Sequence, residues 1–247
     1  MYQLSRNDPR AVDFCSQVIR AGGIFAANLD WVYTLVGDSY SQDLCDLISR
    51  TKGDPRGFTS GWLGLHRIPD FFNSRQVTPT TAVYLSDGDY LADWFGGKVL
   101  LRYPVSPKGC QALPSWMVSQ RGESYYFQQF SFSGRPGAYD IELACARAVA
   151  DLHPECLAPM VAARSANYHG QGSIIEPDAA VRFCTEENIE LVIHNEDEPG
   201  RGSYAILILE PKGNCLVRWT SCTQTEIEHL LGGLPDTLLG EKGACLT

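Results

Sequence analysis

Short apolar segments alternate with amphipathic helical patterns along most of the chain. Val12, Cys15 and Ile19 recur at helical spacing, Gly22 and Gly23 interrupt that pattern, and an apolar segment follows. By the same criteria we expect helices at residues 8–21, 41–50, 140–151, 176–186 and 225–231. We expect strands at residues 24–27, 31–36, 62–66, 81–85, 98–103, 157–163, 189–194, 204–209 and 215–219. This order predicts a mixed α/β fold.

The length and composition fit one folded domain. The chain has 247 residues, of which 44% are hydrophobic and 20% charged, and both fractions are near globular averages. We expect a single domain at residues 1–232 and a mobile tail at residues 233–247. No apolar run approaches the roughly 20 residues that a membrane helix needs, so we expect a cytoplasmic protein with no membrane partner. Residues 104–137 carry no assignable pattern, and the aromatic residues at 125–130 predict core packing.

The cysteines and the charge limit the classes of ligand. The nine cysteines contain no C-x-x-C pair, so we expect reduced thiols that pack as small apolar groups, and no metal site. The net charge of −9 opposes non-specific binding to nucleic acid, which requires a basic surface. A few well-placed residues can still bind the phosphates of a nucleotide. Small-molecule partners are therefore favoured over RNA.

Familiar catalytic motifs are missing from the sequence. There is no Walker loop, no G-x-G-x-x-G, no H-E-x-x-H and no G-x-S-x-G. Small polar residues and one arginine do follow predicted strands, namely Ser165, Asn167, Ser203 and Arg218. Loops at strand ends are where α/β folds place ligands, so these residues are candidates for a binding site.

Four segments in the C-terminal half then match one family in order. Residues 157–170 end in Arg-Ser-Ala-Asn-Tyr-His-Gly and are similar to a strand followed by S-A-N-x-S-G, and residues 191–194 are similar to L-I-L-D. Residues 202–204 with the next strand resemble E-S-T-V-V-D, and residues 217–219 with the last helix resemble L-R-P-G. The family with these motifs is the YrdC-like family of threonylcarbamoyladenylate synthases.

The N-terminal part resembles the same family. Residues 21–35 are similar to G-G-x-V-A-x-P-T-D-T-V-Y-G-L, and residues 52–55 are similar to K-G-R-P. The resemblance covers roughly residues 10–65 and 140–232. Residues 66–139 fit only loosely, with residues 93–96 similar to W-P-G-P, and we expect this region to lack the family's V-R-x-P pattern.

The resemblance implies a fold and a chemistry. It implies a twisted mixed β-sheet flanked by helices with a large concave cavity, and an enzyme that makes threonylcarbamoyladenylate from ATP, bicarbonate and threonine for a tRNA modification. Lys52 matches the lysine that contacts phosphates and carboxylate, and Ser165, Asn167, Ser203 and Arg218 match nucleotide-contacting positions. ATP and Mg²⁺ are the expected cofactors.

The chain also departs from the family where the amino acid would bind. Asn28-Leu29-Asp30-Trp31 replaces P-T-D-T, so both threonines are lost and one becomes an indole. The arginine of K-G-R-P becomes Asp54, with Arg56 two residues later as a substitute. We therefore expect a substrate pocket at Asp30, Trp31, Tyr33 and Arg56 that takes something other than threonine, with Tyr33 at the tyrosine of V-Y-G-L.

Three functions remain open. The first is an adenylate-forming enzyme with an altered acceptor or donor, in which Lys52, Arg218 and Mg²⁺ stabilise the developing charge and His169 acts as a general base or donor. The second is ordinary threonylcarbamoyladenylate synthesis. The third is a non-catalytic module that binds a nucleotide, RNA or a protein. We expect a live nucleotide site, because Lys52, Ser165, Asn167, Ser203 and Arg218 are all retained.

Overall fold

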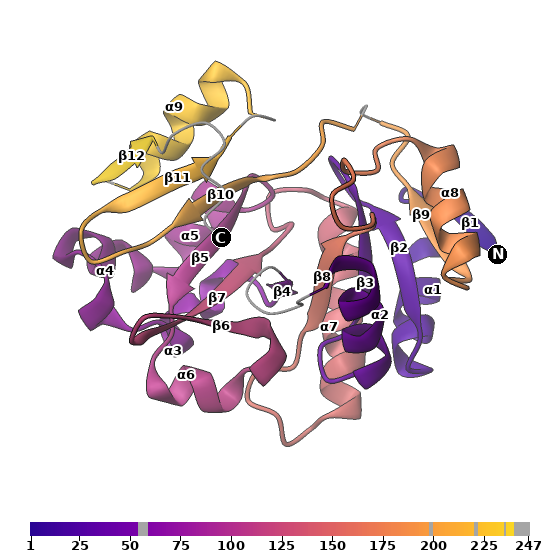
Figure 1. Ribbon diagram of the computed structural model, residues 1–247, viewed down its shortest axis with the longest axis horizontal. Helices are drawn as coiled ribbons and strands as arrows, with labels where there is room; N and C mark the ends of the chain where they lie inside the picture. Colours follow the sequence, from indigo (N-terminus) through magenta and orange to yellow (C-terminus); the bar gives the residue numbers. More distant parts are fainter. Residues whose placement is uncertain (54–58, 198–199, 220–221, 235, 240–247) are drawn as a thin grey trace.

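A single mixed β-sheet with helices packed against it forms the molecule (Figure 1). The computed structural model describes residues 1–53, 59–197, 200–219, 222–234 and 236–239. The strands, in their order across the sheet, are β1 (Tyr2–Ser5), β9 (Leu191–His194), β2 (Ile24–Asn28), β3 (Tyr33–Asp38), β8 (Val161–Ser165), β4 (Ser60–Trp62), β7 (Ser124–Phe130), β5 (Val99–Pro104), β10 (Ala205–Ile208), β11 (Asn214–Arg218) and β12 (Thr237–Leu239). Strand β6 (Val118–Arg121) pairs with β7 off this path.

Parallel and antiparallel pairs mix across the sheet. Strand β3 is antiparallel to both β2 and β8, whereas β4 is parallel to β7 and β10 is parallel to β5. Strands that are distant in sequence therefore lie side by side, so residues from all parts of the chain meet on one face. This is the mixed α/β sheet flanked by helices that the sequence predicts.

Several helices begin with a side-chain cap. Ser41 caps α2 through the Leu44 amide, and Thr223 and Glu226 form a capping box at the start of α9. The helices are α1 (Ala11–Arg20), α2 (Gln42–Lys52), α3 (Ile68–Phe71), α4 (Pro79–Leu85), α5 (Gly88–Phe95), α6 (Pro107–Ala112), α7 (Ala138–Leu152), α8 (Pro177–Glu186) and α9 (Gln224–Gly233). Helices α1, α2, α7, α8 and α9 confirm the five predicted from the sequence.

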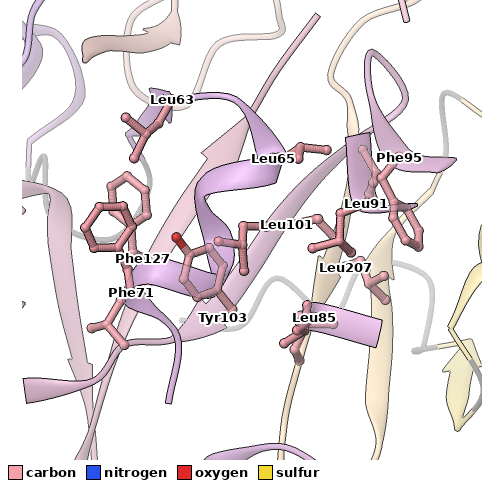
Figure 2. Packing of buried hydrophobic residues seen from close by; sticks show 14 of the residues in the cluster. Leu63, Leu65, Phe71, Leu85, Leu91, Phe95, Leu101, Tyr103, Phe127 and Leu207 are labelled. Atoms are coloured by element: carbon pink, nitrogen blue, oxygen red, sulfur yellow. The ribbon is translucent and has the colours of Figure 1, made fainter. Parts of the chain in front are cut away.

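Alternate residues of each strand belong to opposite faces of the sheet. On β5, Leu101 and Tyr103 pack into one core with Phe127 of β7 and with Phe71 and Leu91 of the helices that cover this face (Figure 2). On the other face, α1 and α7 pack over the half of the sheet that holds β2, β3 and β8. Between these covered regions, the second face of β5, β7 and β4 is left for the site described below.

One predicted strand is wrong. Residues 81–85 form part of α4, because Thr78 caps the helix through the Thr81 amide and Pro79 occupies its first position. The β-branched residues that suggested a strand lie inside this helix. The strand expected at 62–66 is shorter and begins earlier, as β4, and a 3₁₀ turn at Leu65–Arg67 follows it.

The sequence also makes predictions about the C-terminal tail, the cysteines, membrane-spanning helices and the aromatic segment. Thr237–Leu239 pairs with β11 as β12, while the domain boundary at 232 and the mobility of the tail stay predictions. The cysteines of the described residues are free thiols. None of the helices in the described part of the chain combines the length and the apolar character that crossing a membrane requires. Tyr126, Phe127 and Phe130 are buried on β7, which confirms the predicted aromatic packing for these three residues, but Tyr125 is exposed, so for Tyr125 the prediction was wrong.

Candidate functional site

A cavity lies against one face of the sheet, where side chains of neighbouring strands converge. Strand periodicity places Thr34 of β3, Ser165 of β8, Ser60 of β4, Gln128 of β7 and Arg102 of β5 on this face. The cavity has a volume of about 120 Å³. The resemblance implies a large concave cavity, and that size stays a prediction. Its other described lining residues are Leu29, Val32, Trp62, Leu100, Phe130, Phe132, Ala163, Arg164, Ser203, Tyr204, Ile206 and Arg218.

Positive charge is concentrated at this cavity. Arg102, Arg164 and Arg218 line it, and no carboxylate is among its described lining residues. The Arg218 side chain is oriented by its Nε, which donates to the Tyr204 carbonyl at 2.8 Å. In a chain of net charge −9, this local cluster is the arrangement that binds anionic groups such as phosphates.

A polar network holds Arg102 in the sheet. Its Nη2 donates to Oε1 of Gln128 at 2.7 Å, and Nε2 of Gln128 donates to Oγ of Ser60 at 2.7 Å. The three residues come from adjacent strands β5, β7 and β4, and all three are buried. Buried hydrogen-bonded networks are rigid, so the guanidinium is held in place before any ligand arrives.

Lys52 reaches the edge of the same site from the end of α2. Its Nζ donates to Oγ of Ser165 at 3.2 Å and to Oδ1 of Asn167, and the residue is 8% exposed. Burial, and then the nearby Arg164 charge, lower the pKa of Lys52 to about 7. An ammonium beside arginines gains from a bound anion, which makes Lys52 a candidate phosphate ligand.

The shifted lysine predicts pH-dependent binding of ATP. The phosphate-binding form is the ammonium, so binding above pH 7 requires proton uptake by Lys52. We expect the affinity for ATP to fall about tenfold per pH unit above pH 7. Isothermal titration from pH 6.5 to 8.5 measures this slope. The Lys52→Met protein gives the pH dependence that comes from ionisation of the ATP phosphates alone. Equal slopes for the two proteins would contradict the assignment.

The S-A-N segment and Ser203 are placed as predicted, near the cavity. Ser165 ends β8 and lines the cavity, and buried Asn167 is fixed by donating its Nδ2 to the Gln171 carbonyl at 2.6 Å. Ser203 also lines the cavity, and its Oγ lies 2.7 Å from Oγ of Ser173. The structure therefore brings together Lys52, Ser165, Asn167, Ser203 and Arg218. Their functional roles stay predictions.

Other predicted site residues lie elsewhere. Tyr33 points to the opposite face of β3, where its hydroxyl lies 2.5 Å from Nδ1 of His194. Asp30 is buried, with its carboxylate 3.5 Å from Arg135, and His169 is exposed, with its amide bonded to the Thr51 carbonyl. Arg56, with Asp54, lies outside the described residues.

Trp31 occupies a second layer behind the cavity wall. The described lining does not include it; its indole stacks on Tyr204, with centroids 4.9 Å apart, and Tyr204 faces the cavity. The Arg201 guanidinium lies 5.4 Å from the indole centroid, and Trp31 also lines a second pocket together with Arg135 and His229. The resemblance aligns Trp31 with a threonine of the family and so suggests direct substrate contact, but among the described lining residues Tyr204, not Trp31, lies against the cavity.

The sequence analysis missed Arg102, Arg164, Gln128 and Ser60. Arg102 had a usable signal, since Leu101-Arg102-Tyr103-Pro104 is an R-x-P sequence with leucine in place of valine. The exact V-R-x-P pattern is absent from residues 66–139, and residues 101–104 are a variant of it with one substitution. Arg164 directly precedes the S-A-N segment, but nothing in a single sequence shows that this residue lines the cavity.

The described lining of the cavity does not match the ligands that Mg²⁺ prefers. Mg²⁺ prefers carboxylate, phosphate and water oxygens. The described lining supplies hydroxyls and the Gln128 amide but no carboxylate, so these residues do not form a resident magnesium site.

Comparisons with known proteins identify the fold. No family model matches the chain, and no curated protein sequence matches it. The structure of P. abyssi Sua5 complexed with L-threonine superposes with a TM-score of 0.67 at 15% identity, covering 97% of this chain and 63% of Sua5. E. coli YciO gives a TM-score of 0.63 at 13% identity, covering 88% and 93%. Full-length HypF in the phosphate- and nucleotide-bound form gives 0.55 at 10% identity, covering 86% and 24%.

These similarities concern the fold, because the identities are low. The chain spans 65% and 63% of the length of two P. abyssi Sua5 structures, and nearly the whole of YciO. The mixed sheet and its flanking helices thus agree with the architecture expected from the sequence motifs. This chain has the YrdC-like fold of Sua5 and YciO.

Proposed function

We propose that the chain is an adenylate-forming enzyme that uses ATP. The observation that carries the proposal is the convergence of Lys52 with Arg102, Arg164 and Arg218 at one cavity, next to the hydroxyl of Ser165 and the amide of Asn167. Cationic groups suit a triphosphate, while hydroxyl and amide groups suit a ribose. The similarity to HypF solved with phosphate and nucleotide supports a nucleotide ligand.

The proposed reaction is a nucleotidyl transfer. An oxygen of a carbamate or carboxylate attacks the α-phosphorus of ATP, the bond from that phosphorus to the bridging oxygen breaks, and pyrophosphate leaves. The products are a mixed anhydride with AMP and pyrophosphate. Lys52 and the arginines hold the phosphates so that the attacking and the leaving oxygen lie in line. They also stabilise the charge that develops on the phosphates. A side-chain nucleophile is not needed, and His169 is not required as a base, since the attacking oxygen is already ionised.

The acceptor side of the cavity is aromatic. Trp62, Phe130, Phe132 and Tyr204 line it, with Phe130 and Tyr204 in contact at a centroid distance of 4.5 Å. We infer an apolar or aromatic group on the substrate that becomes adenylated, because such a wall stabilises apolar surface. Threonine is the second candidate, favoured by two observations: the described lining leaves Trp31 out, and the fold matches a Sua5 solved with L-threonine.

Product analysis tests the proposal. The purified protein is incubated with ATP, Mg²⁺ and bicarbonate, together with threonine or with one of a panel of apolar amino acids and carboxylates. Pyrophosphate release and adenylates are followed by mass spectrometry. An adenylate formed only with an apolar substrate supports the main proposal, and one formed with threonine supports the second. ATP binding without pyrophosphate release would leave a non-catalytic nucleotide-binding module, and no ATP binding would overturn both.

The aromatic wall predicts a change in selectivity. Tyr204→Ala removes the ring that faces the cavity, so we expect the ratio of kcat/KM between an aromatic and a small substrate to fall by on the order of tenfold to a hundredfold. Trp31→Phe keeps an aromatic ring behind Tyr204 and is the matched control, for which the ratio should stay within about twofold. A larger change for Trp31→Phe than for Tyr204→Ala would contradict the assignment of the wall.

A further inference from the structure

Three metal-binding side chains meet at the loop that follows α7. The potential ligand atoms of His153, Glu155 and Cys156 all lie within 4.8 Å of one another. In a tetrahedral zinc site, ligand atoms stand about 3.5 Å apart, given bonds of roughly 2.0–2.3 Å. Small side-chain movements would close this difference, and the Cys156 amide already bonds to the His153 carbonyl at 3.0 Å, which holds the loop as a turn.

The His153 ring is oriented from outside the loop. Its Nε2 lies 2.7 Å from Oδ2 of Asp38, at the end of β3, and the Tyr40 ring packs against it with centroids 4.7 Å apart. Asp38 is itself fixed by accepting the Tyr40 amide at 2.9 Å. A carboxylate that accepts one imidazole N–H leaves the other nitrogen with its lone pair, and metal-binding histidines are held in this way. The geometry thus makes Nδ1 the available ligand.

We propose that His153, Glu155 and Cys156 form a binding site for a divalent transition-metal ion, with Asp38 as the positioning residue. Nitrogen, oxygen and sulfur donors together match zinc, and water completes a four-coordinate site. A neutral imidazole, a carboxylate and a thiolate carry two negative charges, which balance the ion. The Cys156 thiol is partly buried, and the Tyr40 hydroxyl nearby donates to the Ala158 carbonyl at 3.2 Å.

The position assigns the metal a structural task. Thr34 lines the cavity, whereas Asp38 lies at the other end of the same strand, so the cluster is separate from the candidate site. His153 follows directly after α7, and Ser41 starts α2 a few residues after Asp38. A bound ion would tie the end of α7 to the β3–α2 connection (Figure 1).

Cobalt binding tests the site without reference to activity. The full chain is stripped with a chelator, dialysed and titrated with Co²⁺. We expect one equivalent to produce a near-ultraviolet thiolate-to-cobalt band that Zn²⁺ abolishes by displacement. Cys156→Ser should remove the band, while Cys110→Ser, which changes another partly buried thiol on α6, should retain it. Absence of the band in the wild-type protein, or its persistence in Cys156→Ser, would overturn the proposal.

A second pair of measurements tests the roles of His153 and Asp38. Zn²⁺ should raise the Tm of the wild-type protein but not that of His153→Gln, with circular dichroism confirming that the variant folds. Asp38→Asn should weaken the Co²⁺ affinity about tenfold to a hundredfold with little change in the metal-free Tm. A Zn²⁺-induced rise in Tm that survives His153→Gln would overturn the site, and an unchanged affinity in Asp38→Asn would overturn the positioning role.

Discussion

Replacing Lys52 by methionine is expected to lower the rate of adenylate formation by on the order of 10²- to 10³-fold. Lys52 is held against Ser165 and Asn167 at the edge of the arginine-lined cavity, and it is buried. The Lys52 ammonium lies in a poorly hydrated position. There it stabilises the charge on the phosphates far more strongly than it would in water. Single-turnover formation of the adenylate, measured by quench-flow with labelled ATP, separates this loss from product release.

A matched lysine supplies the control. Lys98 is half-buried, its pKa is also lowered by burial, and its Nζ donates to the Trp94 carbonyl at 2.7 Å, outside the cavity. Lys98→Met should therefore leave adenylate formation within a few-fold of wild type. If Lys98→Met and Lys52→Met reduced the rate equally, the loss would come from general charge or stability and not from phosphate binding.

The same substitution should stabilise the ligand-free protein. The folded state lowers the pKa of Lys52 to about 7 from 10.5, so between these values the unfolded chain holds a proton that the folded chain has lost. Stability therefore rises with pH across this window, and the full cost is present below pH 7. Methionine removes the cost, so the advantage of Lys52→Met in urea unfolding is largest at pH 6 and shrinks toward pH 10. Activity and stability would then oppose each other at this residue.

Local patterns predicted the regular elements well. Amphipathic spacing and start signals predicted five helices, and the apolar segments after the S-A-N region predicted β9, β10 and β11, because these features depend on neighbouring residues. The error at residues 81–85 has a local cause as well: Thr78 and Pro79 start a helix, and that signal outweighs the β-branched residues that follow.

The cavity could be predicted only in part. Ser165, Asn167, Ser203 and Arg218 were found because they match motif positions at strand ends. Arg102 was missed because it lies inside an apolar strand, and its orientation depends on the pairing of β5 with β7 and on Gln128. Trp31 shows the converse, since its match to a threonine position of the family did not reveal that its indole stacks behind Tyr204. Which side chains face the cavity depends on the pairing of strands that are distant in sequence, and no local pattern contains that information.

Glu142 predicts a strong pH dependence of stability. It lies on α7, is 2% exposed, and accepts the Phe132 amide at 2.5 Å and the Ser131 hydroxyl at 3.2 Å. Burial raises the pKa of Glu142 to about 7, against the hydrogen bonds, which lower it. The folded state thus binds a proton that the unfolded state releases above pH 4.5. The contribution of Glu142 to the free energy of unfolding is complete below pH 4.5 and is lost as the pH rises through 7.

The expected size follows from that difference in pKa. We expect the wild-type free energy of unfolding to fall by roughly 3 kcal/mol more than that of Glu142→Gln between pH 4.5 and pH 8.5. Glutamine retains an acceptor oxygen for the Phe132 amide and cannot ionise, so the difference between the two urea-unfolding curves isolates this carboxyl from every other titrating group. Glu190→Gln changes an exposed carboxyl and should follow the wild-type curve. Parallel curves for wild type and Glu142→Gln would show that this carboxyl stays ionised in the core, stabilised by its hydrogen bonds from the Phe132 amide and the Ser131 hydroxyl.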